Sequence, residues 1–396
     1  MTTDEITIPK GYKQTEIGVI PVDWDIKSLG DIGDSIIGLT YSPNDVVEYG
    51  KLVHRSSNIQ NNQLAYKDNV YVNKDISEKL TLRENDILVC VRNGSRDLIG
   101  KSALIKGKAV GETFGAFMSV FRSNKCQKFI YYLFLSNVIQ RQINQSLGAT
   151  INQITNRTLD DFQIPYPKNL DEQIAIADIL SDVNDFTQKL EVLIEKKKSI
   201  KQGVMQELLT GKRRLPGFSD KWEKKKLGEL LDYEQPTKYL VKSTDYNDSH
   251  DIPVLTAGKT FVLGYTDEEF GVFRNLPTII FDDFTTAIKY VDFPFKAKSS
   301  AMKMLVPKNK DVNLRFIFSK MHLLDFKLLD HKRYWISEYQ KIEIDTPKPE
   351  EQTAIANVLS DMDKEIKKLE LELTKYKDIK QGMMQTLLTG KIRLIK

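Results

Sequence analysis

The stretch that decides the fold occurs twice. Residues 172–215 read EQIAIADILSDVNDFTQKLEVLIEKKKSIKQGVMQELLTGKRRL, and residues 351–394 read EQTAIANVLSDMDKEIKKLELELTKYKDIKQGMMQTLLTGKIRL. The copies align without a gap at an offset of 179 residues (351 − 172), and 26 of 44 positions are identical. A period this long indicates a two-fold duplication rather than a solenoid or propeller repeat. The chain therefore has two related halves.

Each copy has the pattern of one long helix. Apolar residues recur every seven positions, which is typical of a coiled-coil seam. Gly211 and Gly390 suit C-terminal caps, so we expect helices of roughly 39 residues, ~55–60 Å long. The predicted seam positions are Ile176, Val183, Leu190, Lys197 and Val204 with Ile179, Phe186, Leu193 and Ile200 in the first copy, and Ile355, Met362, Leu369, Tyr376 and Met383 with Leu359, Ile366, Leu373 and Leu387 in the second.

A weaker repeat precedes each helix. Trp24-x4-Leu29-Gly30 recurs as Trp222-x4-Leu227-Gly228, 198 residues later. The second intervening segment is therefore 19 residues shorter (198 − 179), and the two segments show no visible sequence alignment. The order GK-x-RL followed by this Trp motif is also obtained if the C-terminus is joined to the start of the chain. This predicts that the two ends lie near each other and that the long helices pair antiparallel.

The predicted fold class is α+β: two globular α/β domains joined by two long antiparallel coiled-coil helices, with a pseudo-two-fold internal repeat. The alternatives are a helix hairpin buried in one globule, or two helices that serve separate domains. The expected domains are residues 1–168 (first insert with an N-terminal segment), 169–215 (central spacer helix), 216–347 (second insert) and 348–396 (C-terminal spacer helix).

Composition limits the class of protein. With 396 residues and 41% hydrophobic residues, each half is large enough to bury its own core. Cys90 and Cys126 lie in apolar or strand-like surroundings and are expected to be core residues in a reducing cytoplasm. The N-terminus lacks the pattern of a signal peptide, and no stretch approaches the ~18 apolar residues of a membrane span. We therefore expect a cytoplasmic protein with no membrane contact.

Positive charge is concentrated in the inserts. The net charge is only +4, but residues 93–168 hold 10 Lys and Arg against 4 Asp and Glu, and residues 286–341 hold 12 against 5. A basic excess of this kind is compatible with binding to nucleic acid, although common surface lysines would produce it too.

Clusters of polar and basic side chains on predicted loops are the candidates for base contacts. Arg, Lys, Asn and Gln form the hydrogen-bond pairs that distinguish guanine and adenine in the major groove. The predicted DNA-binding residues are Arg92, Asn93, Ser95, Arg96, Lys101, Asn152, Gln153, Asn156 and Arg157 in the first insert, and Thr285, Thr286, Lys289, Lys296, Lys298, His331, Lys332, Arg333 and Tyr334 in the second.

No catalytic constellation is visible in the sequence. Residues 94–102 (GSRDLIGKS) resemble a phosphate-binding loop but place five residues between the glycines where four are required. The glycine-rich cofactor motif and the Asp/Asn-Pro-Pro-aromatic run of adenine methyltransferases are absent, and the four histidines are scattered. We expect a protein that is not an enzyme and has no cofactor and no metal.

The elements EQxAIAxxLSD, KxIKQGxMQxLLTGKxRL, TEIGxIPxDW (residues 15–24) and LPGFSDKW (residues 215–222) resemble the specificity subunit of type I restriction-modification systems, over essentially the whole chain. The resemblance implies two target recognition domains that each read one half of a split DNA sequence. It also implies a non-catalytic subunit that recruits two modification subunits, which methylate adenine, and restriction subunits, which translocate and cleave DNA.

The same pattern predicts how such a subunit works. A rigid rod between two basic globules would fix the number of unread base pairs between asymmetric half-sites. The helices carry more apolar positions than one seam needs, which suggests a second face for partner subunits. The predicted docking residues are Met205, Leu208, Leu209, Met384, Leu387 and Leu388. The alternative function is a non-catalytic protein-protein scaffold whose basic domains bind acidic partners.

Overall fold

The computed structural model describes residues 8–148, 152–258, 260–326 and 333–394. The chain forms two compact units. Unit 1 comprises Met1–Leu190 and Glu372–Lys396, and unit 2 comprises Glu191–Leu371. The two long helices, α4 (Leu170–Leu209) and α8 (Pro349–Leu387), therefore contribute residues to both units.

The predicted lengths of the long helices are confirmed, since α4 has 40 residues and α8 has 39. Acidic residues occupy the first turn of each, where the helix dipole favours negative charge. Gly211 and Gly390 follow the two helices with φ of 70° and 69°, the left-handed conformation that a glycine cap supplies without steric cost.

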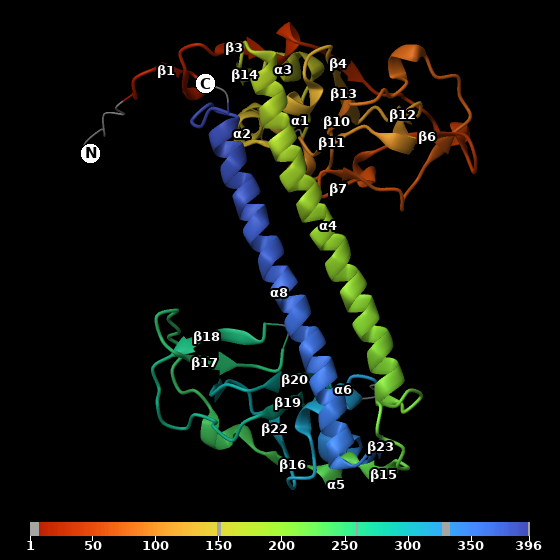
Figure 1. Cartoon of the computed structure of the whole chain (residues 1–396), viewed down its shortest axis with the longest axis vertical. Helices are drawn as coiled ribbons and strands as arrows, with labels where there is room; N and C mark the ends of the chain where they lie inside the picture. Colours follow the sequence, from red (N-terminus) through yellow and green to blue (C-terminus); the bar gives the residue numbers. More distant parts are fainter. Residues whose placement is uncertain (1–7, 149–151, 259, 327–332, 395–396) are drawn as a thin grey trace. The chain divides into compact units, whose positions relative to one another are not determined.

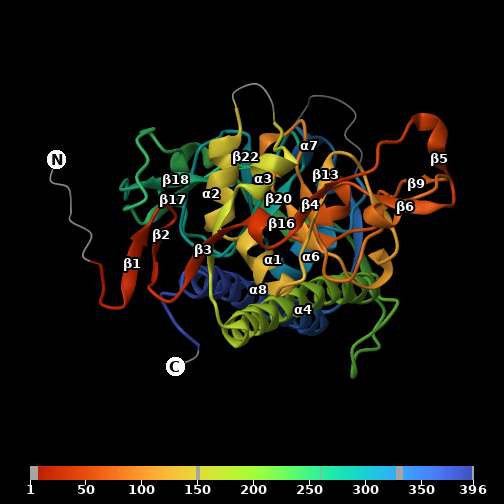
Figure 2. The ribbon, with the colours of Figure 1, turned by 90° about the horizontal axis from the view of Figure 1, so that it is seen from above.

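Within each unit the two helices pair antiparallel. In unit 1, Phe186 packs on Tyr376 with ring centroids 4.5 Å apart, and Lys380 donates to Asn184 at 2.6 Å. In unit 2, Lys197 forms an ion pair with Glu365 at 2.7 Å. Figures 1 and 2 show α4 and α8 side by side. The start of one repeat copy thus meets the end of the other.

This pairing explains which motifs are repeated. The core of unit 1 combines Ile176 and Leu180 from the start of α4 with Leu387 and Leu388 from the end of α8. The core of unit 2 makes the equivalent combination from the other ends of the helices: Leu208, Leu209, Ile355 and Leu359. Each core needs the AIAxxL motif of one copy and the MQxLL motif of the other.

The predicted seam is correct in the second copy and partly wrong in the first. Leu359 and Ile366 are buried as expected. In α4, however, the row Phe186, Leu193 and Ile200 is exposed, and Leu180, Thr187 and Ile194 are buried instead. The buried row lies one residue C-terminal to the predicted row, at the positions that match Leu359, Ile366 and Leu373 by the 179-residue offset.

The insert of unit 1 contains a central four-stranded sheet ordered β11-β10-β13-β4 and a second sheet ordered β12-β6-β9-β5. Helix α1 covers one face of the central sheet, because Ile87 and Val89 join the core that contains Phe129, while Leu88 and Cys90 face Phe114. The elements of unit 1 are β1 (Tyr12–Thr15), β2 (Gly18–Pro21), β3 (Asp25–Ser28), β4 (Asp34–Ile37), β5 (Val46–Val47), β6 (Lys51–His54), β7 (Ile59–Gln60), β8 (Gln63–Leu64), β9 (Tyr71–Val72), β10 (Ile87–Cys90), β11 (Ser102–Leu104), β12 (Thr113–Phe114), β13 (Met118–Arg122), α1 (Gln127–Leu135), α2 (Asn137–Ser146), α3 (Asn156–Asp160) and β14 (Gln163–Tyr166).

Unit 2 has a central sheet ordered β16-β22-β19-β20 and a smaller sheet ordered β18-β17-β21. Ile279 and Phe281 face the core that contains Phe316 of α6, and Ile280 faces Phe295 on the other side. The elements are β15 (Glu223–Lys226), α5 (Leu227–Leu230), β16 (Leu231–Glu234), β17 (Ile252–Leu255), β18 (Val262–Thr266), β19 (Thr278–Asp282), β20 (Ile288–Val291), β21 (Lys296–Ala297), β22 (Met302–Pro307), α6 (Leu314–Met321), α7 (Tyr334–Ser337) and β23 (Glu343–Thr346).

The two inserts share one topology. Strands β4, β13, β10 and β11 correspond in order to β16, β22, β19 and β20, and the parallel pair β12-β6 corresponds to β21-β17. The two inserts therefore share a fold although their sequences show no visible alignment. Sequence alignment misses the relation because a sheet needs only alternating apolar residues on its two faces, which many sequences provide.

The Leu-Gly part of the Trp-x4-Leu-Gly motif holds the start of each insert against its end. The amide of Leu29 donates to the Phe162 carbonyl at 2.9 Å, and the amide of Leu227 donates to the Ile342 carbonyl at 3.0 Å. The following glycine is needed for close packing in unit 2, since a Cβ at Gly228 would lie 3.1 Å from the Gln340 carbonyl oxygen. The strand pairs β3-β14 and β15-β23 close the two inserts in the same way.

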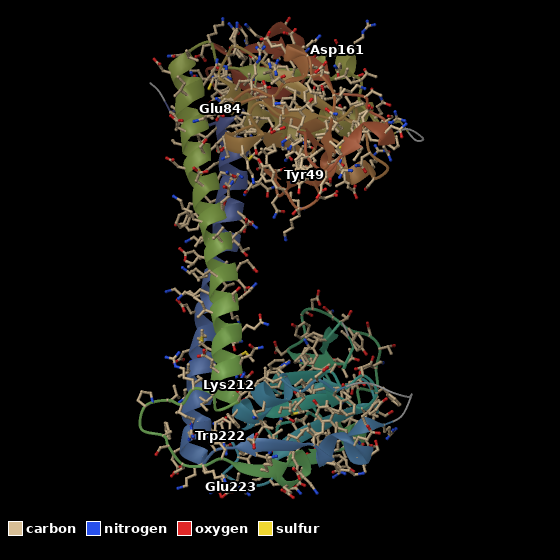
Figure 3. The ribbon with its side chains drawn as sticks, turned by 90° about the vertical axis from the view of Figure 1, so that its right-hand side faces the viewer. Tyr49, Glu84, Asp161, Lys212, Trp222 and Glu223 are labelled. Atoms are coloured by element: carbon tan, nitrogen blue, oxygen red, sulfur yellow. The ribbon has the colours of Figure 1, made fainter. Side chains whose placement is uncertain are left out.

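A Trp-Glu-Arg cluster closes each unit. In unit 1, Trp24 donates to the Glu172 carboxylate at 3.1 Å, and Arg393 binds both oxygens of that carboxylate. In unit 2, Arg214 and Trp222 bind Glu351, in the first turn of α8, in the same manner. Trp222 is labelled in Figure 3.

The first and last described segments of the chain lie together in unit 1, as predicted. Arg393 bonds to Asp23, and the Tyr12 hydroxyl donates to the Gly390 carbonyl at 3.0 Å. The C-terminal segment therefore reaches Trp24 as residues 211–215 reach Trp222.

Candidate nucleic-acid interface

In unit 1 two of the predicted clusters meet at the end of β10. The Ile154 amide donates to the Val91 carbonyl at 2.8 Å, and Arg92 forms an isolated antiparallel bridge with Gln153. The Asn93 amide donates to the Asn152 carbonyl at 3.2 Å. These bonds bring residues 92–93 and 152–153, which are about 60 positions apart in the sequence, next to each other just beyond the end of β10. We call this region the edge of unit 1.

The side chains at this edge have different roles. Arg92 is exposed, and its guanidinium carbon lies 4.9 Å from the centre of the Phe117 ring. Asn93 donates to the Ser56 hydroxyl at 3.0 Å, and Asn152 donates to the Gly94 carbonyl at 3.0 Å. The two asparagines hold the turn in place, whereas Arg92 has neither a hydrogen bond nor an ion pair through its guanidinium to any described residue.

The remaining candidates of unit 1 also divide into side chains that are bonded within the fold and side chains that are exposed to solvent. Arg96 donates to the Asn144 carbonyl at 3.1 Å and Asn156 donates to the Ser35 carbonyl at 2.8 Å, so both side chains are used inside the fold. Lys101 is half-buried and lies 3.4 Å from the Ser56 carbonyl oxygen. Exposed candidates beside the edge are Ser95 and Arg157.

Unit 2 presents an equivalent edge at the end of β19. The Tyr334 amide donates to the Asp283 carbonyl at 2.9 Å, and the Trp335 amide donates to the Asp283 carboxylate at 2.9 Å. Asp283 is itself buried in an ion pair with Lys303 at 3.2 Å. The turn 282–286 is thereby joined to residues 333–335. Thr285, Thr286 and Arg333 therefore lie together just beyond the end of β19, in the region that we call the edge of unit 2.

Two candidates of unit 2 are wrong. Lys296 is fully buried in an ion pair with Glu268 at 2.5 Å and donates to the Phe270 carbonyl, so its charge is neutralised inside the unit. Tyr334 is also fully buried, beside Phe326. Lys289, Lys298, Thr285 and Arg333 are exposed and Thr286 is half-buried, while His331 and Lys332 lie outside the described residues.

The predicted docking residues are also wrong. Leu208 and Leu209 are buried in the core of unit 2, and Met205 packs against that core. Met384, Leu387 and Leu388 are buried in the core of unit 1. The apolar excess at the helix ends is used to attach the helices to the inserts, not to form a free face.

A different set of helix residues is exposed, and these residues are related by the repeat. Val192 is 70% exposed and its counterpart Leu371 is 65% exposed. Ile200 and its counterpart Ile379 are 45% and 38% exposed. The sequence signal was available, because each pair holds apolar residues 179 positions apart.

Two buried groups with strongly shifted pKa values, His54 and Cys90, lie in the core of the first insert. Burial lowers the pKa of His54 to about 4, and neither ring nitrogen has a partner among the described residues. Burial raises the pKa of the Cys90 thiol to about 11, which is typical of an unreactive core cysteine. Within the described ranges no group of three or more His, Cys, Asp or Glu side chains is arranged to hold a metal ion. None of the described helices is long and apolar enough to cross a membrane.

Comparison with known proteins agrees with this geometry. The family model for the type I restriction modification DNA specificity domain matches residues 21–202 and again residues 219–375. The putative type I restriction enzyme MjaX specificity subunit of Methanocaldococcus jannaschii is 29% identical over 97% of both chains. The EcoR124I/EcoR124II specificity subunit of Escherichia coli is 55% identical, but over only 31% of this chain and 32% of that protein.

Two solved structures have the same fold. The S subunit of a type I restriction-modification system from M. genitalium covers 92% of this chain and 96% of its own, with a TM-score of 0.65 and 18% identity. A second chain, from a study of complex assembly and conformational transition in the type I R-M system, covers 94% of this chain and 99% of its own, with a TM-score of 0.56 and 15% identity. With two matched domains over most of its length, the chain belongs to the family of type I restriction-modification specificity subunits.

Proposed function

We propose that this chain is the non-catalytic subunit that selects the DNA sequence for a type I restriction-modification complex, and that it reads an asymmetric target in two halves. The main support is the equivalent edge in each unit, built on the same strand of the same topology but carrying different side chains. Arg92 with Gln153 occupies the edge of unit 1, and Thr285 with Arg333 occupies that of unit 2. Equivalent frames with different readers predict two different half-sites in one target.

The proposed division of labour follows the boundaries expected from the sequence. Residues 1–168 and 216–347 would each bind one half-site, and residues 169–215 and 348–396 would set the spacing. Arg92, Ser95, Arg157, Thr285, Lys289, Lys298 and Arg333 are exposed and remain the proposed DNA contacts, together with Lys332 and His331 outside the described residues.

We place the modification subunits on the exposed repeat-related residues. Val192 and Leu371 form one pair and Ile200 and Ile379 another, so a partner surface occurs in two copies. Two equivalent surfaces suit two copies of one partner, as expected for a complex with two modification subunits. Restriction subunits would join that complex, which would act on duplex DNA in the cytoplasm.

Binding to duplex DNA tests the proposal. The purified complex with the modification subunit should bind a duplex that contains the motif it methylates more tightly than a scrambled duplex. Its affinity should fall steeply as the salt concentration increases. Methylome sequencing of a host with and without this chain should identify one bipartite motif. A complex that binds no DNA would favour the protein-scaffold alternative.

An exchange of inserts tests the division into two readers. Replacing residues 231–345 with the matching insert of a relative retains β15, α5 and the Trp222 cluster, and it replaces all of β23 except Thr346. One half of the methylated motif should change and the other should stay. A change in both halves would contradict independent reading.

A further inference from the structure

At the edge of each unit, an exposed phenylalanine accompanies an exposed arginine. In unit 1 these are Phe117, which is 56% exposed, and Arg92, 4.9 Å from its ring centre. In unit 2 they are Phe284, which is 39% exposed, and Arg333. Neither phenylalanine is a predicted contact: Phe117 lies in an apolar segment, where an aromatic residue is usually a core residue, and Phe284 is the single aromatic residue of the polar run 282–286.

Backbone hydrogen bonds show that the two edges correspond residue by residue. Val91 corresponds to Asp283, since the first accepts from Ile154 and the second accepts from Tyr334. The residues that follow, Arg92 and Phe284, are therefore equivalent. The residues that precede Ile154 and Tyr334 are Gln153 and Arg333, so these are equivalent too.

The same comparison locates Phe117. The Val91 amide donates to the Phe117 carbonyl at 3.1 Å, and the Asp283 amide donates to the Ala301 carbonyl at 3.1 Å. Unit 1 thus has its arginine in the turn after β10 and its phenylalanine in the residue before β13. Unit 2 takes phenylalanine from the turn and arginine from the segment before α7. The same two side-chain types therefore occur at both edges, although they come from non-equivalent segments of the two inserts.

The fold holds these backbones firmly. Phe117 accepts hydrogen bonds from the amides of both Val91 and Arg92. The Phe284 amide donates to the Asp282 carboxylate at 2.9 Å, and the Arg333 carbonyl accepts from the Ser337 hydroxyl at 2.6 Å. A rigid backbone beneath an exposed side chain is the arrangement needed to present that side chain to a ligand.

We infer that each arginine and phenylalanine form one base-reading pair, Arg92 with Phe117 and Arg333 with Phe284, which recognises a guanine next to a thymine in the major groove. The inference rests on the proposed function and names one guanine-thymine step that each unit reads. The two half-sites differ at the positions read by other side chains, such as Gln153 in unit 1 and Thr285 in unit 2. A guanidinium donates two hydrogen bonds to O6 and N7 of guanine. The thymine 5-methyl is the apolar group of the major-groove edge, and a phenylalanine ring is a suitable contact for it.

Base analogues that remove single atoms test the inference. The target is first identified by methylome sequencing, and each thymine in it is then replaced by deoxyuridine, which lacks only the 5-methyl group. For the complex with wild-type protein, one such replacement in the first half-site should weaken binding about 4-fold, the value of one buried apolar carbon. The Phe117→Ala complex should be insensitive to the same replacement.

The arginine is tested in parallel. Replacing guanine by 7-deazaguanine removes the N7 acceptor and keeps O6, so it should weaken binding by wild-type protein about 2- to 12-fold at the position read by Arg92, which is about half the free energy of a bidentate pair. The Arg92→Ala complex should show no further loss there. Phe284→Ala and Arg333→Ala should behave likewise in the other half-site.

The two units serve as controls for each other. Phe117→Ala should leave every position of the second half-site unchanged, and Phe284→Ala should leave the first unchanged. Phe117→Leu, which keeps an apolar side chain, should retain part of the deoxyuridine sensitivity. The inference is overturned if wild-type and Phe117→Ala complexes respond equally to every deoxyuridine while both prefer the target. Failure of wild-type protein to prefer its target would instead overturn the proposed function.

Discussion

Arg393 and Glu172 form a two-point ion pair that ties the end of the chain to the first turn of α4. The Glu172 side chain is 1% exposed, and its carboxylate also accepts a bond from Trp24. Bonding to Glu172 and Asp23 raises the pKa of Arg393, so the guanidinium stays charged. Arg214, Glu351 and Trp222 repeat the arrangement in unit 2.

Removal of Arg393 should destabilise unit 1 selectively. Arg393→Ala leaves a buried carboxylate without its cation, and we expect a loss of about 3 kcal/mol in the free energy of unfolding. Hydrogen exchange resolved along the chain should show the loss in residues 8–190 and not in residues 220–345. Arg213→Ala is the matched control, because Arg213 is 70% exposed in its pair with Glu207 and should contribute little. Equal effects of the two substitutions would contradict this role.

Substitutions on the exposed helix surface should separate assembly from folding. Val192→Asp with Leu371→Asp places charge on residues that are 70% and 65% exposed, so the fold should tolerate it. If the modification subunit covers these residues, its affinity should fall at least about tenfold, because burying an unpaired carboxylate is unfavourable. Titration of the modification subunit by calorimetry measures the change.

The control for assembly is Val110→Asp, which also introduces a carboxylate at an exposed apolar residue. Val110 lies in the first insert, outside the two long helices, and is 41% exposed. It should leave affinity for the modification subunit unchanged. Unaltered affinity in the helix variant would move the partner surface elsewhere.

The frame of the molecule was predictable because its signal is repeated. Two copies of a 44-residue pattern gave the helix lengths, and the matching motifs gave the antiparallel pairing and the close termini. Within the first copy alone, the row at Phe186 and Leu193 is as apolar as the buried row at Leu180 and Ile194. The second copy distinguishes the two rows, because the counterparts of Phe186 and Leu193 are Glu365 and Glu372, whereas those of Leu180 and Ile194 are Leu359 and Leu373.

The site was less predictable, because exposure depends on neighbours that are distant in sequence. Lys296 is buried only because Glu268 and the Phe270 carbonyl neutralise it. Phe117 is exposed although its neighbours Met118 and Ser119 are buried. A basic or apolar residue in a single sequence does not reveal whether its side chain reaches solvent.

Unit 1 should lose stability in mild acid through His54. Burial lowers its pKa from 6.5 to about 4, so the folded state resists protonation. Below about pH 6.5 the unfolded chain takes up a proton that the folded chain does not, and stability present above that pH is lost progressively down to about pH 4. The loss should reach on the order of 3 kcal/mol.

Unfolding of His54→Leu as a function of pH checks this assignment. The variant keeps an apolar side chain beside Tyr66 and removes the titrating ring. Its unit 1 should show a flatter pH dependence between pH 6.5 and 4 than wild-type protein. His322→Leu, in unit 2, is the control and should leave the pH dependence of unit 1 unchanged. The same slope in wild type and His54→Leu would exclude His54 as the source.

The length of the paired helices should set the gap between the half-sites. Lys197 faces Glu365 at 2.7 Å, so four helical residues inserted after Lys197 need four more after Glu365 to keep the pairing. The added rise is ~6 Å, which corresponds to about one or two base pairs of ~3.4 Å. Methylome sequencing should show both half-sites unchanged and the gap longer. The same four residues placed in the loop after Gly217 lengthen no helix and should leave the gap as it was. An active double-insertion variant with the original gap would show that the helices are not the ruler.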